Sequence, residues 1–267
     1  FKNALMSSRV QIIATLGPTS ATPEILQALL AAGVDVVRFN LSWTAPTELR
    51  AQVGLVRTVA AKAGRAVPVI ADLPGPRVQE SAGHKFNAQE SVPTAHDVQL
   101  IALCTELKIE YVGVSFVGKA AELRRVREAL GGAPTRIVAK IERAEALENL
   151  AEIIAAADGV MVARGDLGHA IPLEQVPFVQ ERIVREASAA GKPVIVATDM
   201  LRSMIQSQEP TRAEVGDVAT AVLQGADAIM LSDETAVGIH PTEVVVTMER
   251  IALEAEKHLP QSPLHPL

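Results

Sequence analysis

The sequence predicts an α/β fold, a (β/α)8 TIM barrel, because short apolar segments alternate with helical segments eight times along 267 residues. The apolar segments are rich in Val and Ile and almost unbroken in hydrophobicity, as strands buried on both faces of a parallel sheet are. A weak repeat, in which a helix ends, an acid follows and a strand begins, recurs at residues 33–37, 109–114, 157–162 and 225–230. A doubly wound open sheet is the alternative fold, but no G-x-G-x-x-G segment follows the first strand and no P-loop motif occurs.

The strands and helices are expected in strict alternation. The first helix opens at Thr22, Pro23 and Glu24, because Thr caps, Pro suits the first turn and an acid suits the positive end; Gly33 closes it. The predicted strands are residues 10–16, 34–41, 67–73, 111–116, 136–141, 159–163, 193–198 and 226–231. The other predicted helices are residues 46–62, 96–107, 119–130, 144–156, 173–190, 211–223 and 242–256. Residues 74–95 have no strong period and are expected to form a long loop or a small lid.

The domain organisation follows from these elements. We expect one barrel over residues 9–259 and a tail at 260–267. Residues 1–8 are interpreted as a vector remnant and a disordered start, because Met6 looks like the natural first residue and no signal-peptide apolar region precedes it. No apolar run approaches ~18 residues, so no transmembrane helix is expected and the protein is predicted to be cytoplasmic.

Composition excludes several classes of partner. Asp and Glu number 31 against 25 Lys and Arg, so no basic surface for nucleic acid or an anionic membrane is expected. Aromatic residues make up only 3% of the chain, which leaves few platforms for stacking nucleic acid bases. The lone Cys104 excludes a disulfide framework and a cysteine-rich metal site, and it is expected in the core. No paired-histidine spacing for zinc and no G-x-S-x-G hydrolase motif is present.

Polar residues at the carboxyl ends of the strands are the candidates for chemistry, since a barrel of this type places its active site there. Arg38, Asn40 and Ser42 alternate onto one face at the end of the second strand. The guanidinium fork of Arg38 suits a carboxylate or phosphate, although an internal salt bridge is the alternative. Asp72 ends the third strand and could equally cap the following turn.

The fifth and sixth strands end in two carboxylates and a lysine. Lys140 and Glu142 share a face, and Asp166 follows the neighbouring strand. Two carboxylates with waters and substrate oxygens are the usual Mg²⁺ arrangement, and a lysine can stabilise an anion or an enolate. The alternatives are a Lys140–Glu142 salt bridge and a turn cap at Asp166. Gly165 and Gly168 are expected to let the backbone turn sharply and offer N–H groups to an anion.

The last two strands offer weaker candidates. Thr198 ends the seventh strand and could relay a proton. Ser232 and Glu234 follow the eighth strand and could act through water, or could only tie loops together.

Together these segments resemble the pyruvate kinase family, in family order and over nearly the whole chain. The matching stretches are residues 14–20, 37–42, 139–142, 158–168, 191–198, 210–214 and 232–236. The resemblance implies a barrel of the phosphoenolpyruvate/pyruvate type. It implies Mg²⁺ or Mn²⁺ at Glu142 and Asp166, and Lys140 beside the transferring phosphoryl group and the enolate oxygen.

The resemblance also assigns roles around the metal site. Arg38 corresponds to a phosphate-contacting arginine, and Thr198 to the position of substrate contact and proton delivery. Backbone N–H groups of Gly165 and Asp166 would bind the substrate carboxylate. The remaining implied groups are substrate-binding Ala163 and Arg164, and a K⁺ site at Asn40, Ser42 and Asp72. A homo-oligomer is expected because residues 210–214 resemble a family stretch near a subunit interface.

The sequence departs from the family pattern on the nucleotide side. Residues 74–95 occupy the place of the family's lid domain, and the sequence ends soon after its last helix, where the family continues into a C-terminal domain. Leu73 removes a cation-ligating hydroxyl. Gln79 stands where the family has an arginine for the nucleotide phosphates, with Arg77 two residues away, and Trp43 replaces a histidine.

Because these losses spare the pyruvate and metal side, sequence reasoning favours a lyase over a phosphotransferase. The favoured enzyme is Mg²⁺-dependent and handles pyruvate or a related keto acid as its enolate, by aldol cleavage or addition or by β-keto acid decarboxylation. One alternative is a lid-less pyruvate kinase or a phosphoenolpyruvate phosphatase, which lacks a lid to exclude water. The other is a non-catalytic homologue that binds a metabolite.

Overall fold

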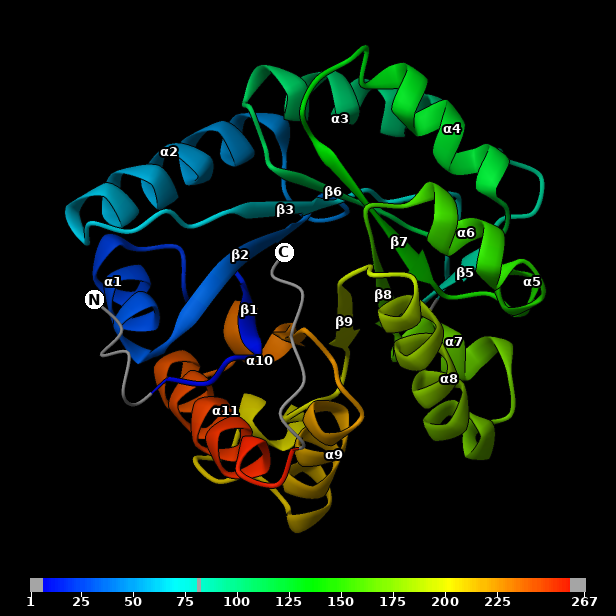
Figure 1. Ribbon diagram of the computed structural model, residues 1–267. Coiled ribbons are helices and arrows are strands. Elements are labelled where there is room, and N and C mark those ends of the chain that lie inside the picture. The colour runs from blue at the N-terminus through cyan, green and yellow to red at the C-terminus, as the bar shows by residue number, and fades with distance from the viewer. Residues whose placement is uncertain (1–6, 81–82, 260–267) are drawn as a thin grey trace.

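The computed structural model describes residues 7–80 and 83–259 and contains a closed barrel of parallel strands surrounded by helices (Figure 1). Around the barrel the strands follow the order β1, β10, β9, β8, β7, β6, β3, β2, so that each is hydrogen-bonded to two neighbours. The strands are β1 (Gln11–Thr15), β2 (Val34–Asn40), β3 (Val69–Asp72), β6 (Tyr111–Val114), β7 (Arg136–Ile141), β8 (Gly159–Ala163), β9 (Val194–Ala197) and β10 (Ala228–Leu231). Each lies within a predicted strand, and the (β/α)8 barrel is confirmed.

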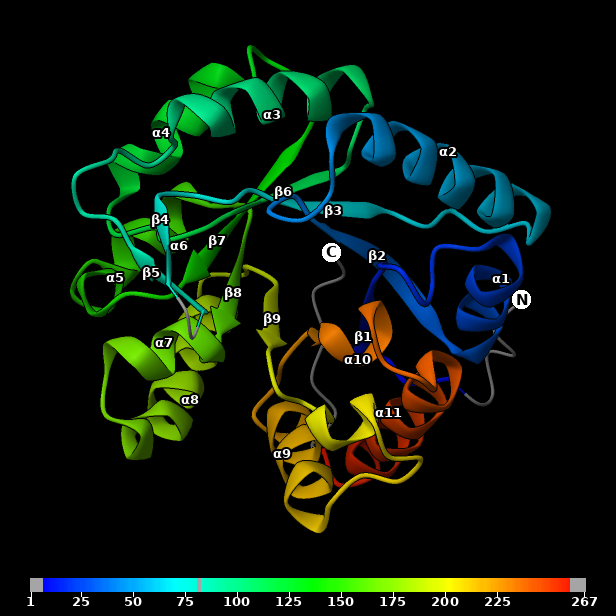
Figure 2. The same ribbon diagram turned by 180° about the vertical axis from the view of Figure 1, so that it is seen from behind.

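The helices lie outside the barrel and cover its strands (Figure 2). They are α1 (Pro23–Ala32), α2 (Pro46–Lys62), α3 (Ala95–Glu106), α4 (Ala120–Ala129), α5 (Ala144–Glu148), α6 (Leu150–Ala156), α7 (Arg164–Ala170), α8 (Val176–Ala189), α9 (Arg212–Leu223), α10 (Asp233–Ala236) and α11 (Pro241–Glu256). The capping signals act as expected at α1: the Thr22 side chain accepts the Ile25 N–H, and Gly33, with φ of 125°, ends the helix.

Two predicted segments differ from the structure. The expected helix over 144–156 is divided into α5 and α6 at Asn149, whose side-chain amide donates to the carbonyl oxygens of Gly118 and Glu145. An Asn side chain that bonds nearby backbone competes with the helical ladder, which explains the break. The sharp turn expected around Gly165 and Gly168 is instead the first part of helix α7.

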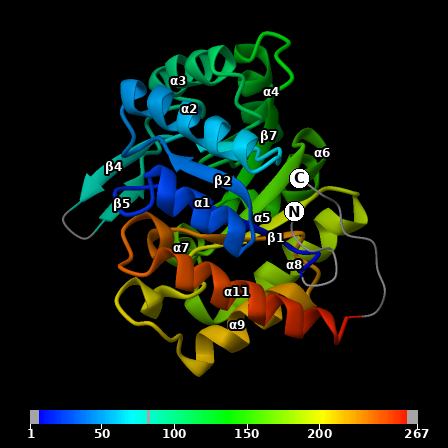
Figure 3. The same cartoon turned by 90° about the vertical axis from the view of Figure 1, so that its left-hand side faces the viewer.

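The segment after β3 contains a small antiparallel hairpin, β4 (Arg77–Glu80) and β5 (Gly83–Phe86). A side view places the hairpin at one end of the barrel, on the side opposite the C-terminal end of α11 (Figure 3). Because the hairpin follows β3 and all the barrel strands are parallel, this end of the barrel is the carboxyl end of every strand, and it is called the mouth below. The hairpin fits the small-lid alternative for residues 74–95 better than an irregular loop.

Two apolar layers hold the barrel together. One fills the space between strands and helices, and the other plugs the interior with side chains from alternate strand positions: Ile13, Val36, Ile70, Tyr111, Val138, Met161, Ile195, Ala197, Ala228 and Met230. Because the interior is packed with side chains, chemistry is confined to the polar layer above this plug.

The sequence predictions for the two chain ends concern residues 1–8 and 260–267. Residues 1–6, most of the segment interpreted as a vector remnant, and residues 260–267 lie outside the described residues. Ser8 is buried, and its N–H and hydroxyl both donate to the carboxylate of Glu249 in α11. Searching the described residues finds no helix with the length and hydropathy needed to cross a bilayer.

Cys104 lies in the core as the sequence predicts, and burial raises the pKa of its thiol to about 12. Compared with a free thiol, this reduces the thiolate fraction at pH 8 by about a thousandfold. We expect a disulfide reagent such as DTNB to label less than a tenth of the protein in an hour under native conditions, and one thiol per chain in 6 M guanidinium. Rapid stoichiometric labelling of the native protein would contradict this placement.

Candidate active site

Strand alternation carries polar side chains to the mouth directly above the apolar plug. Along β2 the inward series runs from Val36 to Arg38, and along β3 it runs from Ile70 to Asp72. On β7 the same two-residue step leads from Val138 in the plug to Lys140, and then to Glu142 just beyond the strand. The alternating pattern therefore brings the polar side chains from the ends of three hydrophobic strands together at the mouth.

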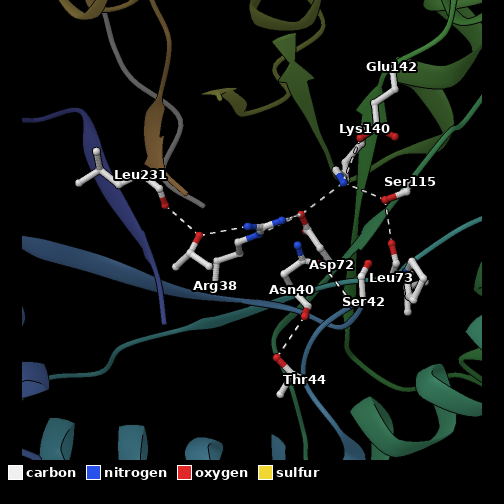
Figure 4. A network of polar contacts seen from close by, with 12 residues as sticks. Arg38, Asn40, Ser42, Thr44, Asp72, Leu73, Ser115, Lys140, Glu142 and Leu231 are labelled. Carbon is white, nitrogen blue, oxygen red and sulfur yellow. Dashed lines mark hydrogen bonds and ion pairs between the residues drawn. The ribbon is translucent and has the colours of Figure 1, made fainter. Parts of the chain in front are cut away.

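These side chains form a connected network (Figure 4). Arg38 donates from Nε and Nη2 to Asp72 Oδ2 at 3.1 and 2.9 Å, and its Nη1 donates to Thr15 Oγ1 at 3.1 Å. Lys140 Nζ lies 3.4 Å from the same Asp72 oxygen and 3.0 Å from Glu142 Oε1. Two cations thus flank one buried carboxylate, and the salt-bridge alternative for Arg38 and for Lys140 is present in this structure.

Hydrogen bonds with the two residues that directly follow β6 fix the lysine and the glutamate. Lys140 Nζ donates to Ser115 Oγ at 2.8 Å, and Ser115 donates in turn to the Leu73 carbonyl oxygen at 2.7 Å. The backbone N–H of Phe116, a residue with φ of 57°, donates to Glu142 Oε2 at 2.6 Å. Lys140 and Glu142 are therefore held in place before any ligand arrives.

The charges in this network support one another. Burial favours the neutral amine of Lys140, but the charges of Glu142 and Asp72 outweigh it and raise the pKa of Lys140 above its usual value. Burial likewise favours a protonated Asp72, but the charges of Lys140 and Arg38 outweigh it and lower the pKa of that carboxyl. Both groups are consequently charged at neutral pH.

Replacing Asp72 with Asn is expected to lower the free energy of unfolding by about 3 kcal/mol at pH 7, because two buried cations lose their shared partner. Since the folded pKa of Asp72 lies below its unfolded value, its contribution is complete above the unfolded pKa and disappears as the pH falls through the folded pKa. Urea unfolding of both proteins should show a constant difference in stability from pH 7 down to about pH 4 and converging stabilities below it. A difference that stays constant well below about pH 4 would contradict the pairing.

Glu142 and Asp166 line one cavity of about 440 Å³ together with Phe86, Phe116, Arg143, Glu145, His169 and Ala170. Burial, and the neighbouring charge of Asp166, raise the pKa of Glu142 although Lys140 opposes the shift. Two carboxylates that repel each other across a shared cavity fit a hard divalent cation, which takes one or two carboxylates and completes its shell with waters or substrate oxygens. Within residues 7–80 and 83–259 no group of three or more His, Cys, Asp or Glu side chains could hold a metal by itself.

The residues assigned to K⁺ also come together. Asn40 Oδ1 accepts the Ser42 N–H at 3.2 Å, and Asn40 pairs with Asp72 in the sheet register. Asp72 Oδ1 and Ser42 Oγ are buried oxygens without a hydrogen-bond partner among the described residues. Two buried oxygens without hydrogen-bond partners fit a monovalent cation. The apolar side chain of Leu73 supplies no third oxygen ligand.

Thr198 lies against the start of α7. A Cβ on Gly165 would stand 2.8 Å from Thr198 Cγ2, so only glycine allows this approach. Thr198 has a φ of 78°, and its carbonyl oxygen accepts Arg164 Nη2 at 2.6 Å. Arg164 also pairs with Asp217 at 2.6 Å, so its side chain positions the loop after β9, while the buried Ala163 ends β8 beside Asp166.

Of the three weaker candidates, Ser232 and Glu234 lie together after β10, and Arg77 lies in β4 of the hairpin. Glu234 is buried and accepts hydrogen bonds from the N–H groups of Leu201 at 3.2 Å and Ser232 at 2.7 Å. These bonds connect the loops after β9 and β10, as expected if Glu234 only ties loops together. Arg77 donates to the Pro74 carbonyl oxygen, and its guanidinium lies 5.8 Å from the centre of the Phe116 ring. Burial lowers the pKa of Arg77, while the charges of Glu142 and Asp166 oppose the shift, so Arg77 lies within electrostatic range of these two carboxylates.

Sequence reasoning missed Thr15, Ser115, Phe86 and Phe116. Thr15 and Ser115 are each the polar residue at the end of a predicted strand, so the rule that found Arg38 and Asp72 would have found them. Phe86 and Phe116 carried no recognisable signal, since their meeting depends on the hairpin.

The structure is thus a closed parallel (β/α)8 barrel with a buried Arg–Asp–Lys–Glu network and a second carboxylate at the carboxyl end of its strands, where barrels of this type have their active sites. The family model of the pyruvate kinase barrel domain matches residues 7–101 and 85–245. The chain belongs to the pyruvate kinase family.

Curated relatives agree with this assignment. The chain is 35% identical to a pyruvate kinase of Methylorubrum extorquens over 94% of this chain and 69% of that protein. It is 34% identical to a pyruvate kinase of Mycobacterium intracellulare, covering 97% of this chain and 72% of the relative, and 32% identical to one of Thermococcus litoralis, covering 95% and 71%. The first alignment spans 332 positions, more than the 267 residues of this chain, so the relative carries residues without a counterpart here.

The expectation that a lyase is favoured over a phosphotransferase is wrong. The relatives that match over nearly the whole chain are named pyruvate kinase, which is a phosphotransferase. The shortness of segment 74–95 had suggested that the phosphoryl-transfer side of the site is lost. In the structure that segment still forms a hairpin at the mouth, and Arg77 at its base lies within electrostatic range of Glu142 and Asp166.

Proposed function

We propose that this protein transfers the phosphoryl group of phosphoenolpyruvate to a nucleoside diphosphate such as ADP. The observation that carries the proposal is the intact network of Arg38, Asp72, Lys140 and Glu142 at the mouth of a pyruvate kinase family barrel. Phosphoryl transfer between anions depends mainly on positioning and charge neutralisation, and these residues supply two buried cations to the mouth.

Each residue has a distinct role in the proposal. Arg38 and Lys140 hold the phosphoryl group, and Lys140 also stabilises the enolate oxygen left when the phosphorus–oxygen bond breaks. The first-turn N–H groups of Gly165 and Asp166 in α7 bind the substrate carboxylate, since the first N–H groups of a helix have no intrahelical partner. In this proposal Thr198, which packs against Gly165, passes a proton to the enolate carbon.

The cofactors form part of the same proposal. Glu142 and Asp166 would hold Mg²⁺ or Mn²⁺, and Asn40, Ser42 and Asp72 would hold K⁺. A divalent cation supplies charge neutralisation at the substrate oxygens. Arg38 and Lys140 orient the substrate, and Asp72 holds both cations in place.

Assembly and location stay predictions. A homo-oligomer through residues 210–214 would appear in light scattering as a mass that is a multiple of 28.3 kDa. Cell fractionation would test the expected cytoplasmic location.

The deciding experiment measures pyruvate, ATP and inorganic phosphate from phosphoenolpyruvate with Mg²⁺ and K⁺, with and without ADP. We expect pyruvate and ATP in equal amounts, and a rate that depends on ADP. Equal pyruvate and phosphate release with or without ADP would replace the proposal with a phosphatase. No release under either condition, with phosphoenolpyruvate still bound in calorimetry, would indicate a non-catalytic metabolite-binding protein.

A further inference from the structure

The β4–β5 hairpin meets the barrel through an aromatic contact at the edge of the catalytic cavity. Phe86, the last residue of β5, has its ring centre 5.6 Å from that of Phe116, with the two planes inclined by 40°. Both rings line the cavity that also contains Glu142 and Asp166. Through Phe86 the hairpin therefore supplies one wall of the space beside the proposed metal ligands.

Arg143 holds this wall from the barrel side. Its guanidinium carbon lies 4.2 Å from the centre of the Phe86 ring, well within the range of a cation–π contact. The side chain is only 12% exposed, and its Nη2 pairs with the carboxylate of Glu145. A desolvated guanidinium on an aromatic face is worth more than the same contact in open solvent.

The surroundings of Arg143 leave it little freedom to move elsewhere. A Cβ on Gly118 would collide with the Arg143 guanidinium and approach Glu145 Oε2, so the absence of a side chain at Gly118 makes the passage for Arg143. Lys119 Nζ lies 3.1 Å from Glu145 Oε1 and holds that carboxylate in turn. The geometry around Gly118 thus directs the guanidinium onto Phe86.

The two stems of the hairpin segment are fixed independently of Arg143. The Gly75 N–H donates to Asp97 Oδ1 at 3.1 Å, and Arg125 donates from Nε and Nη2 to the Val92 carbonyl oxygen at 3.1 and 2.5 Å. Removal of the Arg143 contact should therefore loosen β4 and β5 without detaching the segment from the barrel.

The same short stretch of chain holds the metal ligand and the hairpin. Glu142 accepts the Phe116 N–H, while Arg143, its direct neighbour, stacks on Phe86, which packs on the Phe116 ring. We propose that Arg143 is a positioning residue that locks the hairpin over the cavity, so that the phosphoryl group reacts with the nucleotide and not with water. For its activity readout this inference rests on the proposed function.

The two competing reactions differ in the acceptor. In transfer, the bond between phosphorus and the enol oxygen breaks, a terminal phosphate oxygen of ADP binds phosphorus, and the enolate takes a proton at its methylene carbon to give pyruvate. In hydrolysis a water oxygen binds phosphorus instead, one water proton ends on pyruvate, and inorganic phosphate leaves. Because water competes with ADP for the same phosphorus, the phosphate-to-ATP ratio reports how well the cavity excludes water.

The experiment compares wild type with Arg143→Met, which keeps the length of the side chain but not its charge, and with Arg143→Lys, which keeps the charge. Arg136→Met is the matched control, because Arg136 lies 5.7 Å from the Tyr111 ring centre at the opposite end of β7. Amide hydrogen exchange is measured on peptides that cover β4 and β5, and phosphate and ATP are measured with saturating ADP.

For Arg143→Met we expect exchange in the hairpin about tenfold faster than in wild type. We also expect a phosphate-to-ATP ratio about fivefold to tenfold higher. Arg143→Lys should restore most of both values, Phe86→Ala should reproduce the Met variant, and Arg136→Met should change neither. Unchanged hairpin exchange in Arg143→Met overturns the lock, and faster exchange with an unchanged product ratio overturns its role against water. If wild type itself forms neither product, the proposed function fails and the exchange data still decide the lock.

Discussion

Replacing Lys140 with Met is expected to lower kcat for phosphoryl transfer by about a thousandfold or more. Lys140 is buried and charged, and its Nζ is held by Ser115 Oγ at 2.8 Å and by Glu142 Oε1 at 3.0 Å. A preorganised charge of this kind stabilises the developing enolate without reorganisation during the reaction. Because the lost interaction is strongest in the transition state, kcat should fall much more than the affinity for phosphoenolpyruvate.

The same change removes a cation that two buried carboxylates share. Asp72 and Glu142 would face each other with Arg38 as the remaining neighbour, so the free energy of unfolding should fall by about 3 to 5 kcal/mol. Lys192→Met is the control, since Lys192 Nζ donates to the Ala157 carbonyl oxygen away from the mouth. Steady-state kinetics and urea unfolding check the two effects. A Lys140→Met enzyme with more than a tenth of wild-type kcat would remove Lys140 from the proposed mechanism.

The fold could be predicted from sequence because each barrel strand carries its own signal. Parallel strands buried on both faces read as unbroken Val and Ile runs, and the helices between them carry caps such as Thr22 and Gly33. The site could be predicted in part for a related reason. Two-residue alternation at a strand end placed Arg38 with Asn40, and Lys140 with Glu142, on the face toward the mouth.

What sequence reasoning could not predict depends on contacts between segments distant in the chain. The contact between Phe86 and Phe116 requires the β4–β5 hairpin to fold back over the barrel, and no local period announces it. The packing of Thr198, which follows β9, against Gly165 at the start of α7 likewise joins two segments that are distant in the chain. The mistaken preference for a lyase arose from residues 74–95, the segment that contains the hairpin. Its shortness is visible in the sequence, but its position beside the cavity is not.

Replacing Glu142 with Gln or Asp166 with Asn is expected to reduce kcat/KM for phosphoenolpyruvate by about a thousandfold at a fixed Mg²⁺ concentration. Both carboxylates line the cavity of about 440 Å³, and the amides that replace them keep nearly the same shape but lose a negative charge. Calorimetry with Mg²⁺ or Mn²⁺ should show weaker binding in each variant. Asp199→Asn is the control, because Asp199 also follows a strand end but is exposed and pairs with Arg202 at 2.7 Å.

The pH dependence separates a metal ligand from a structural carboxylate. Burial and the charge of Asp166 raise the pKa of Glu142, so protons compete for this carboxylate at higher pH than for an ordinary glutamate. Apparent Mg²⁺ affinity of wild type should therefore fall as the pH is lowered from 8 toward 5, and the fall should be smaller in Glu142→Gln, which has no proton to gain. Because the amide oxygen introduced by Glu142→Gln can still accept the Phe116 N–H, the fold should persist and circular dichroism should match wild type. Equal metal affinity in wild type and both variants would show that these carboxylates hold no cation.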